Sequence, residues 1–196
     1  VTPIEIPYTV EERPDTGVTN PRLGVWLFLA SEAMLFASLI SAYVLLRSGA
    51  EFWPRQADFV NVRLALLNTL VLIVSSVTMV MAWVSLKVGQ FRSYRVYMGL
   101  TVLAGTGFLI LKSLEYGEKF AHHYFPATNN FLGMYFALTG VHIVHLAGGV
   151  LVNLYLLGPG ARLWASEPGR FTGRVEVAGL YWHFVDLVWL FLFPLL

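Results

Sequence analysis

The stretch GLYWHFVDLVWLFLFPLL, residues 179–196, indicates the class of protein to which this chain belongs. With the apolar residues just before it, the stretch is long enough to cross a bilayer, which takes about 20 mostly apolar residues in a helix. Two ionisable residues, His183 and Asp186, interrupt it. A charged side chain at the centre of a bilayer costs at least about 2.5 kcal/mol on insertion scales, so such residues usually mark a function or a partner. We therefore expect a membrane-spanning helix over residues 175–196 whose two polar side chains need partners.

The composition of the whole chain is typical of a membrane protein. Of its 196 residues, 57% are hydrophobic and only 13% are charged, whereas a soluble domain carries roughly 25% charged residues. The mean hydropathy is +0.64. The net charge of +1 provides no basic field for a nucleic acid. The absence of cysteine excludes disulfides, iron–sulfur clusters and zinc sites built from thiolates.

Four more stretches are apolar enough to span a membrane: residues 23–46, 64–86, 97–114 and 131–157. The segments between them are short and rich in proline, glycine and charge, as loops are. We therefore expect an all-α integral membrane bundle of five transmembrane helices. Residues 1–22 are acidic and lack the apolar core of a signal peptide, so we expect an extramembrane tail there and one transmembrane domain over residues 23–196. The sequence contains no internal repeat of the kind found in many transporters.

The basic residues predict the orientation of the bundle, because cytoplasmic loops carry an excess of Lys and Arg. The eight on the side of the N-terminus are Arg13, Arg22, Lys87, Arg92, Arg95, Arg162, Arg170 and Arg174. The five on the other side are Arg47, Arg55, Arg63, Lys112 and Lys119. We therefore expect a cytoplasmic N-terminus and a C-terminus outside.

Carboxylates lie in the first and fifth predicted spans and directly after the third. Glu32 lies well inside the first span. It is either a protonated carboxyl hydrogen-bonded to a neighbouring helix or a proton-active or lipid-facing carboxyl, and the sequence does not choose between these. Lys112 and Glu115 lie three residues apart near the end of the third span, so they share a helix face and can form an ion pair. We expect a structural pair in which Lys112 extends outward to the membrane surface.

The fourth span contains two histidines, His142 and His145, on one helix face. Nearby are Gly140, Gly148 and Gly149, small residues that allow a close helix neighbour. Two intramembrane histidines invite a haem or copper site, with His183 as the remaining ligand candidate inside a span. We expect instead that both histidines are hydrogen-bonded within a network of packed helices and that the chain holds no metal.

One face of the fifth span carries Glu176, Gly179, His183 and Asp186, and another face carries Trp182 and Trp189. His183 and Asp186 are three residues apart and can hydrogen-bond directly, which would lower the cost of burying them. An acid–base relay is one interpretation of such a pair. The favoured one is a buried contact that satisfies the pair itself or a neighbouring helix.

Five stretches now point to a family. They are WLFLASEAMLF (26–36), LALLNTLVLIVSSVTMVMAW (64–83), LKSLEYGE (111–118), YFALTGVHIVHLAGG (135–149) and VEVAGLYWHFVDLVWLFLF (175–193). In this order, each on its own helix, they resemble subunit III of the haem-copper oxidases, and WHFVDLVW is the most specific of them. The mitochondrial form of that subunit has seven spans, whereas shorter bacterial forms resemble the five predicted here. Removing two helices from the family's topology also gives a cytoplasmic N-terminus.

The resemblance implies an accessory role without redox chemistry in this chain, because the family's haem and copper belong to subunits I and II. A subunit III packs on subunit I, binds phospholipid, supports proton uptake and protects the complex during turnover. By matching position, Glu32 corresponds to the carboxylate of the family that reacts with carbodiimide. The family's recurring polar positions also include Glu115, His142, His145, Glu176, His183 and Asp186. Arg162 resembles a lipid-headgroup contact, and Arg47 is a second candidate.

The resemblance therefore implies a subunit of a bacterial cytochrome c oxidase in the cytoplasmic (inner) membrane, with no catalytic residue of its own. Its expected partners are subunit I directly, subunit II and cytochrome c in the same complex, and membrane lipids, but no nucleic acid. One alternative is the equivalent subunit of a quinol oxidase or of a nitric oxide reductase assembly. Two others are an independent membrane transporter and a small b-type cytochrome whose haem is bound by His183 and by His142 or His145.

Overall fold

The chain folds into a bundle of long helices in the computed structural model, which describes residues 10–54 and 62–196. The long helices are α1 (Asn20–Gly49), α2 (Val62–Lys87), α3 (Phe91–Ala121), α4 (Asn130–Leu157) and α6 (Pro168–Leu195). Two short pieces, η2 (Pro159–Arg162) and α5 (Leu163–Ser166), join α4 to α6. The described ranges contain no strand, and all five long helices are long and apolar enough to cross a membrane. The prediction of an all-α bundle with five transmembrane helices is confirmed.

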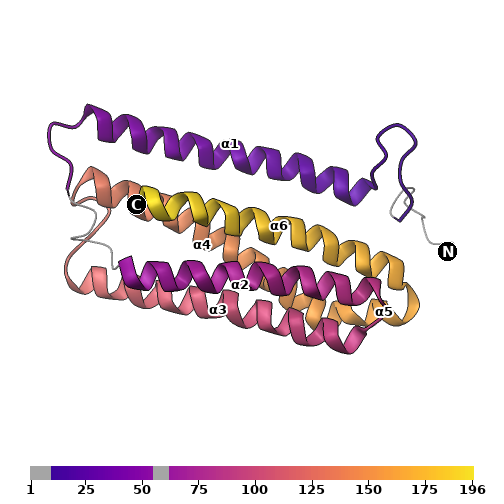
Figure 1. The fold of residues 1–196 in the computed structure, drawn as a ribbon. Coiled ribbons are helices and arrows are strands. Elements are labelled where there is room, and N and C mark those ends of the chain that lie inside the picture. The colour runs from indigo at the N-terminus through magenta and orange to yellow at the C-terminus, as the bar shows by residue number, and fades with distance from the viewer. Residues whose placement is uncertain (1–9, 55–61) are drawn as a thin grey trace, which may run out of the picture.

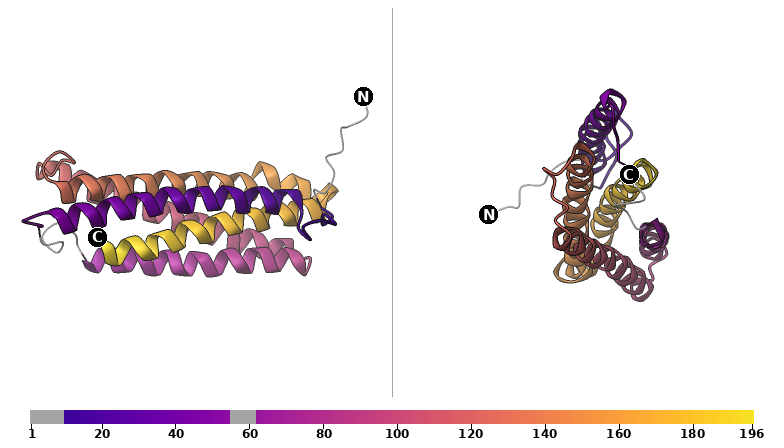
Figure 2. Two further views of the ribbon diagram at one scale, coloured as in Figure 1. Left: turned by 90° about the horizontal axis from the view of Figure 1, so that it is seen from above. Right: turned by 90° about the vertical axis from the view of Figure 1, so that its left-hand side faces the viewer.

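The helices run alternately up and down, so that their connections gather at the two ends of the bundle (Figure 1). The start of α1, the α2–α3 turn and the α4–α6 connection lie at one end, and the C-terminus lies at the other. Helix α6 packs against α1, α2 and α4, while α3 packs against α2 and α4. The end-on view in Figure 2 shows α6 between its neighbours and α1 at the margin of the bundle.

The helix ends follow from local sequence. Asn129 caps α4, since its side chain accepts a hydrogen bond of 2.8 Å from the backbone N–H of Leu132. Proline begins α6 at Pro168, where its missing N–H is no loss. Gly89 has a positive φ of 75° in the tight turn between α2 and α3, a conformation that glycine adopts without strain.

Two helices extend beyond their predicted spans. Helix α3 was expected over 97–114 but runs from Phe91 to Ala121, and α6 begins at Pro168 rather than at 175. The assignment of residues 91–95, 115–121 and 168–174 to loops is therefore wrong. Hydropathy falls where charged residues begin, but Glu115 and Lys119 are buried and paired inside the bundle, so the helix continues through them.

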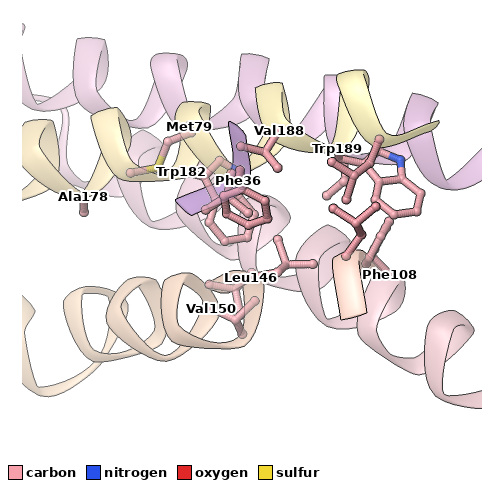
Figure 3. Close-up of a cluster of buried hydrophobic side chains, with 14 of the residues drawn as sticks. Phe36, Met79, Phe108, Leu146, Val150, Ala178, Trp182, Val188 and Trp189 are labelled. Atoms are coloured by element: carbon pink, nitrogen blue, oxygen red, sulfur yellow. The ribbon is translucent and has the colours of Figure 1, made fainter. Parts of the chain in front are cut away.

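The centre of the bundle is built around two tryptophans of α6. Trp182 is fully buried, and its indole N–H donates to the hydroxyl of Ser75 at 3.1 Å. Trp189 donates in the same way to the hydroxyl of Thr69 at 3.0 Å. Figure 3 shows both indoles among the buried side chains that α4 and other helices contribute. The indole N–H groups of Trp182 and Trp189 therefore both have partners.

Gly149 is confirmed as a site of close helix approach, since a Cβ there would lie 3.0 Å from the ring of Trp182. Gly148 has only an ordinary contact, at 3.7 Å from the hydroxyl oxygen of Tyr181. The expectation for Gly140 is wrong, because nothing lies within 4 Å of the position its Cβ would take. The closest approach is instead at Gly105 of α3, which the sequence did not single out.

Candidate functional site: buried polar clusters and an end groove

Glu32 of α1 is hydrogen-bonded to His145 of α4. The Glu32 Oε2 and His145 Nε2 atoms are 2.8 Å apart, and both side chains are mostly buried. The other ring nitrogen of His145, Nδ1, lies 2.8 Å from the carbonyl oxygen of Val141. Tyr181 of α6 donates its hydroxyl to the carbonyl oxygen of His145 at 2.8 Å. Three helices thus hold this pair, and Glu32 faces a helix neighbour rather than lipid.

The hydrogen bonds of His145 fix where its protons lie. A carbonyl oxygen only accepts, so Nδ1 carries a hydrogen that it donates to Val141. A neutral His145 then has a bare Nε2, which accepts from a protonated Glu32, whereas a protonated His145 donates from Nε2 to an ionised Glu32. The pair has zero net charge in both arrangements. One proton can therefore cross the 2.8 Å contact without changing the charge of the pair.

Lys112 and Glu115 of α3 form the predicted ion pair, with 2.8 Å between Lys112 Nζ and Glu115 Oε2. Lys119 lies on the other carboxylate oxygen at 3.4 Å, and Tyr135 of α4 donates its hydroxyl to that same oxygen at 2.5 Å. The expected outward extension of Lys112 is wrong, because this side chain is only 2% exposed. Its ammonium instead lies 4.7 Å from the ring centroid of Trp189, a cation–π contact that helps to hold a buried cation.

These four side chains, defined here as the lysine cluster, contain two cations and one anion. Removing the Glu115 carboxylate would leave both lysines without a counter-charge inside the bundle. All polar atoms of Glu115 are occupied by Lys112, Lys119 and Tyr135. The cluster is therefore a clamp between α3 and α4, and its carboxylate has no free oxygen for a proton-transfer role.

His183 does not bond directly to Asp186, so the predicted direct pair is wrong. The Nδ1 atom of His183 lies 2.6 Å from the hydroxyl oxygen of Ser76 on α2. Both carboxyl oxygens of Asp186 are buried without a hydrogen-bond partner within the described ranges. The alternative of a contact with a neighbouring helix is thus confirmed for His183. The spacing of three residues would permit a direct hydrogen bond between His183 and Asp186. The imidazole of His183 is instead hydrogen-bonded to the hydroxyl of Ser76.

His142 is fully buried, and neither of its ring nitrogens has a hydrogen-bond partner among the described residues. Its ring contacts aromatic side chains instead, with centroid distances of 5.8 Å to Phe108 and 5.1 Å to Trp189. The expectation that both histidines are hydrogen-bonded is correct for His145 and wrong for His142. Its neighbours are aromatic rings that accept only weakly, so a buried imidazole in this position is left unsatisfied.

Glu176 of α6 is paired with Arg22 at the start of α1. A second carboxylate, that of Glu12 in the N-terminal tail, lies 3.9 Å from the same guanidinium. This ion-pair network ties the tail and α1 to α6 at one end of the bundle. Glu176 was predicted as a polar position of the helix. Arg22 entered the prediction only as one of the basic residues that indicate orientation, so the pair itself was not predicted.

Beside this network lies a groove of about 1120 Å³ between α1 and the pair of helices α4 and α6. Its walls are apolar and aromatic, with Phe28, Val152 and Tyr181 among them. Its basic lining residues are Arg22, Lys87, Arg170 and Arg174. We call it the end groove.

The two residues proposed as headgroup contacts, Arg162 and Arg47, do not line the end groove. Both are exposed. Arg162 lies in η2, and Arg47 lies in the last turn of α1, at opposite ends of the bundle (Figure 1). They therefore do not share a site.

The histidines do not converge on a metal. Across residues 10–54 and 62–196 no group of three or more His, Cys, Asp or Glu side chains is arranged to hold a metal ion. Both ring nitrogens of His145 are occupied, and His183 is bonded to Ser76 through Nδ1. A haem ligand at His145 would have to give up its contact with Glu32.

The chain matches known proteins over almost its whole length. The profile of the family described as cytochrome c oxidase subunit III matches residues 14–196. The cytochrome c oxidase subunit 3 of Alkalihalophilus pseudofirmus is 32% identical over 185 residues, which are 93% of this chain and 88% of that protein. The protein of the same name from Bacillus subtilis is 35% identical over 177 residues, 89% of this chain and 84% of the relative. The cytochrome bo(3) ubiquinol oxidase subunit 3 of Pseudomonas aeruginosa is 30% identical over 190 residues, which are 96% of this chain and 89% of that protein.

Proposed function

Because this chain belongs to the cytochrome c oxidase subunit III family, we propose that it is the non-redox accessory subunit of a bacterial cytochrome c oxidase. The observation that carries the proposal is the family match over residues 14–196, which includes all five long helices. The chain would then act in aerobic respiration as part of an oxidoreductase complex whose haem and copper are held by the other subunits. Subunit I would be its direct partner, with subunit II and cytochrome c in the same complex.

The test compares the oxidase with and without this chain. The purified complex should show the same haem spectrum and a similar initial rate of oxygen consumption in both forms. Without the chain, however, the rate should decline faster during continuous turnover, because the accessory subunit protects the complex. Adding the chain back should slow the decline. Equal decay rates of the two forms would contradict the protective role.

A role in proton uptake is proposed for the Glu32–His145 pair, since it can move one proton between α1 and α4 without a change of charge. Glu32→Gln keeps the size of the side chain and supplies an N–H that can donate to Nε2 of His145, so assembly should be retained. Its carboxyl proton is gone, so the pH dependence of oxidase turnover should shift. An unchanged pH profile in an assembled Glu32→Gln complex would remove the pair from proton uptake.

The end groove is proposed to bind phospholipid. Its apolar walls suit acyl chains, and Lys87, Arg170 and Arg174 suit an anionic headgroup near the membrane surface. Replacing Arg174 by Gln should lower the amount of anionic phospholipid that co-purifies with the complex. Arg47→Gln, at the opposite end of the bundle, is the matched control for a headgroup contact outside the groove. Equal lipid content in the two variants would contradict binding in the groove.

The proposed location is the bacterial cytoplasmic membrane, with the N-terminus in the cytoplasm. The structure strengthens the charge argument behind this orientation, because Lys112 and Lys119 on the other side are buried and paired rather than displayed in a loop. The chain contains no cysteine, so single cysteines can report which side is accessible. A cysteine in place of exposed Ser166 should be protected from an impermeant thiol reagent in intact cells, and one in place of exposed Glu51 should react. The reverse pattern would invert the orientation.

A quinol oxidase is the second candidate assembly, since one relative carries the name of a ubiquinol oxidase subunit. The two assemblies differ in their electron donor. Detection of a binuclear copper centre in the subunit II that co-purifies with this chain would favour cytochrome c, and its absence would favour a quinol.

A further inference from the structure

A second cavity lies on the outer face of the bundle between α2 and α6. It has a volume of about 300 Å³, which is far larger than the roughly 30 Å³ that one water molecule occupies in the liquid. Its polar lining comes from Thr69 and Ser76 of α2 and from His183 and Asp186 of α6. We call this cavity the α2–α6 pocket. Figure 1 shows the two helices side by side along most of their length, and they are among the packed pairs of the bundle.

The α2–α6 pocket contains a carboxyl group without a partner. Neither oxygen of Asp186 has a hydrogen bond from the described residues. Ser76 lies close to Asp186, but the hydrogen bond of its hydroxyl is to Nδ1 of His183, at 2.6 Å. Asp186 lies nine residues before the end of α6, which places it about 14 Å along the helix from that end. A carboxyl at this depth is costly unless it is paired, because lipid tails offer no hydrogen-bond donor.

The rim of the pocket is apolar. Ile73, Leu187 and Leu190 surround it and are 47%, 53% and 51% exposed. A polar centre inside an apolar rim is the pattern of a protein interface, where the central group finds its partner and the rim excludes water. Between helices in a membrane, such polar contacts provide specificity that apolar packing alone does not. The chemistry of the pocket therefore calls for a protein side chain with an O–H or N–H group.

We infer that the α2–α6 pocket is the docking site for a transmembrane helix of a neighbouring oxidase subunit, which inserts a hydrogen-bond donor that binds the Asp186 carboxyl. This inference rests on the proposed function, because it assumes that the chain sits in an oxidase complex. The inference adds to the proposed function by naming the α2–α6 face as the surface that contacts the neighbouring subunit. Ile73, Leu187 and Leu190 pack around the inserted helix, and the Ser76–His183 contact keeps the wall of the pocket in place.

Photo-crosslinking in the intact complex tests the docking face. A benzophenone amino acid replaces Leu190 at the rim, and the matched control places it at Val144 of α4, which is 70% exposed and lies outside the pocket. The expected result is a crosslink from position 190 to a larger subunit, at least tenfold more abundant than from position 144. Crosslinks from position 190 to lipid alone, or equal yields from both positions, would overturn the inference.

A second measurement tests the carboxyl itself. Asp186→Asn keeps an acceptor oxygen in the pocket, whereas Asp186→Leu replaces it with an apolar side chain. The haem subunits recovered per tagged chain should be near normal for Asp186→Asn and should fall at least tenfold for Asp186→Leu. Full recovery with Asp186→Leu would show that no partner binds the carboxyl. The proposed function would still stand in that case, because the wild-type chain would co-purify with haem subunits. The proposed function would be contradicted only if the wild-type chain itself recovered no haem subunits.

Discussion

The contact between Gly105 and Trp182 gives a prediction whose size follows from the structure. A Cβ at Gly105 would lie 2.6 Å from Cη2 of Trp182 and 2.8 Å from Cγ2 of Val150, both shorter than any ordinary contact. Neither neighbour can withdraw easily. Trp182 is fully buried and bonded to Ser75, and the methyl group of Val150 is on a short, branched side chain. Gly105→Ala should therefore force α3, α4 and α6 apart.

The matched control is Gly107→Ala, two residues further along α3, where nothing lies within 4 Å of the new methyl group. Overpacking a core costs about 1–3 kcal/mol. Alanine is also favoured over glycine in a helix by about 1 kcal/mol, but that gain is common to both variants and cancels in their difference. The free energy of unfolding of Gly105→Ala should thus be lower than that of Gly107→Ala by about 1–3 kcal/mol.

The assay is thermal unfolding of the purified complex in mild detergent, followed by tryptophan fluorescence and by release of this subunit. For chains of this size about 1 kcal/mol corresponds to about 2–4 °C in Tm. Gly105→Ala should unfold or release its subunit about 2–12 °C below Gly107→Ala. Equal midpoints for the two variants would refute the close packing of α3 on Trp182.

Two further predictions concern charged groups. Glu115→Gln removes the only carboxylate of the lysine cluster, so it should destabilise the bundle by about 3–5 kcal/mol, as breaking a buried ion pair does. Glu118→Gln, exposed on the same helix, is its control, and similar Tm values for the two would contradict the clamp. In the N-terminal tail, the hydrogen bonds from Arg13 lower the pKa of Asp15 from 3.8 to about 2. Because that pKa is depressed, the contact is present above about pH 4 and is lost only as the pH falls toward 2. Amide hydrogen exchange of residues 13–18, corrected for the intrinsic pH dependence of exchange, should therefore be constant between pH 5 and 8, and a change in that range would contradict the prediction.

Much of the fold could be predicted from hydropathy. The five spans stand out because each helix presents apolar side chains to lipid as well as to the core, so even a largely exposed helix such as α1 is mostly apolar on all faces. The Lys112–Glu115 pair was also predictable, since its members are three residues apart on one helix. The end of α3 was not, because the buried ion pairs of Glu115 extend that helix beyond its apolar stretch. The start of α6 was not either, because proline, glycine and arginine give residues 168–174 the composition of a loop.

The partners of the buried polar groups could not be predicted. Glu32 and His145 are separated by 113 residues, and Arg22 and Glu176 by 154. Helical periodicity shows which residues share a face, but it does not show which helix lies opposite that face. The contact between Ser76 and His183 could not be predicted for the same reason. The available signal was a small polar residue, Ser76, in the middle of an apolar span.

The most direct test of the account is to purify this chain through an affinity tag in mild detergent and to record the reduced-minus-oxidised spectrum of what is recovered. The account predicts haem bands from larger subunits that co-purify with the chain, and a chain without haem bands after those subunits are stripped away. A solitary, colourless chain in the first step would contradict an accessory oxidase subunit and favour a transporter. Haem that stays bound to the stripped chain would also contradict an accessory oxidase subunit and would favour a b-type cytochrome.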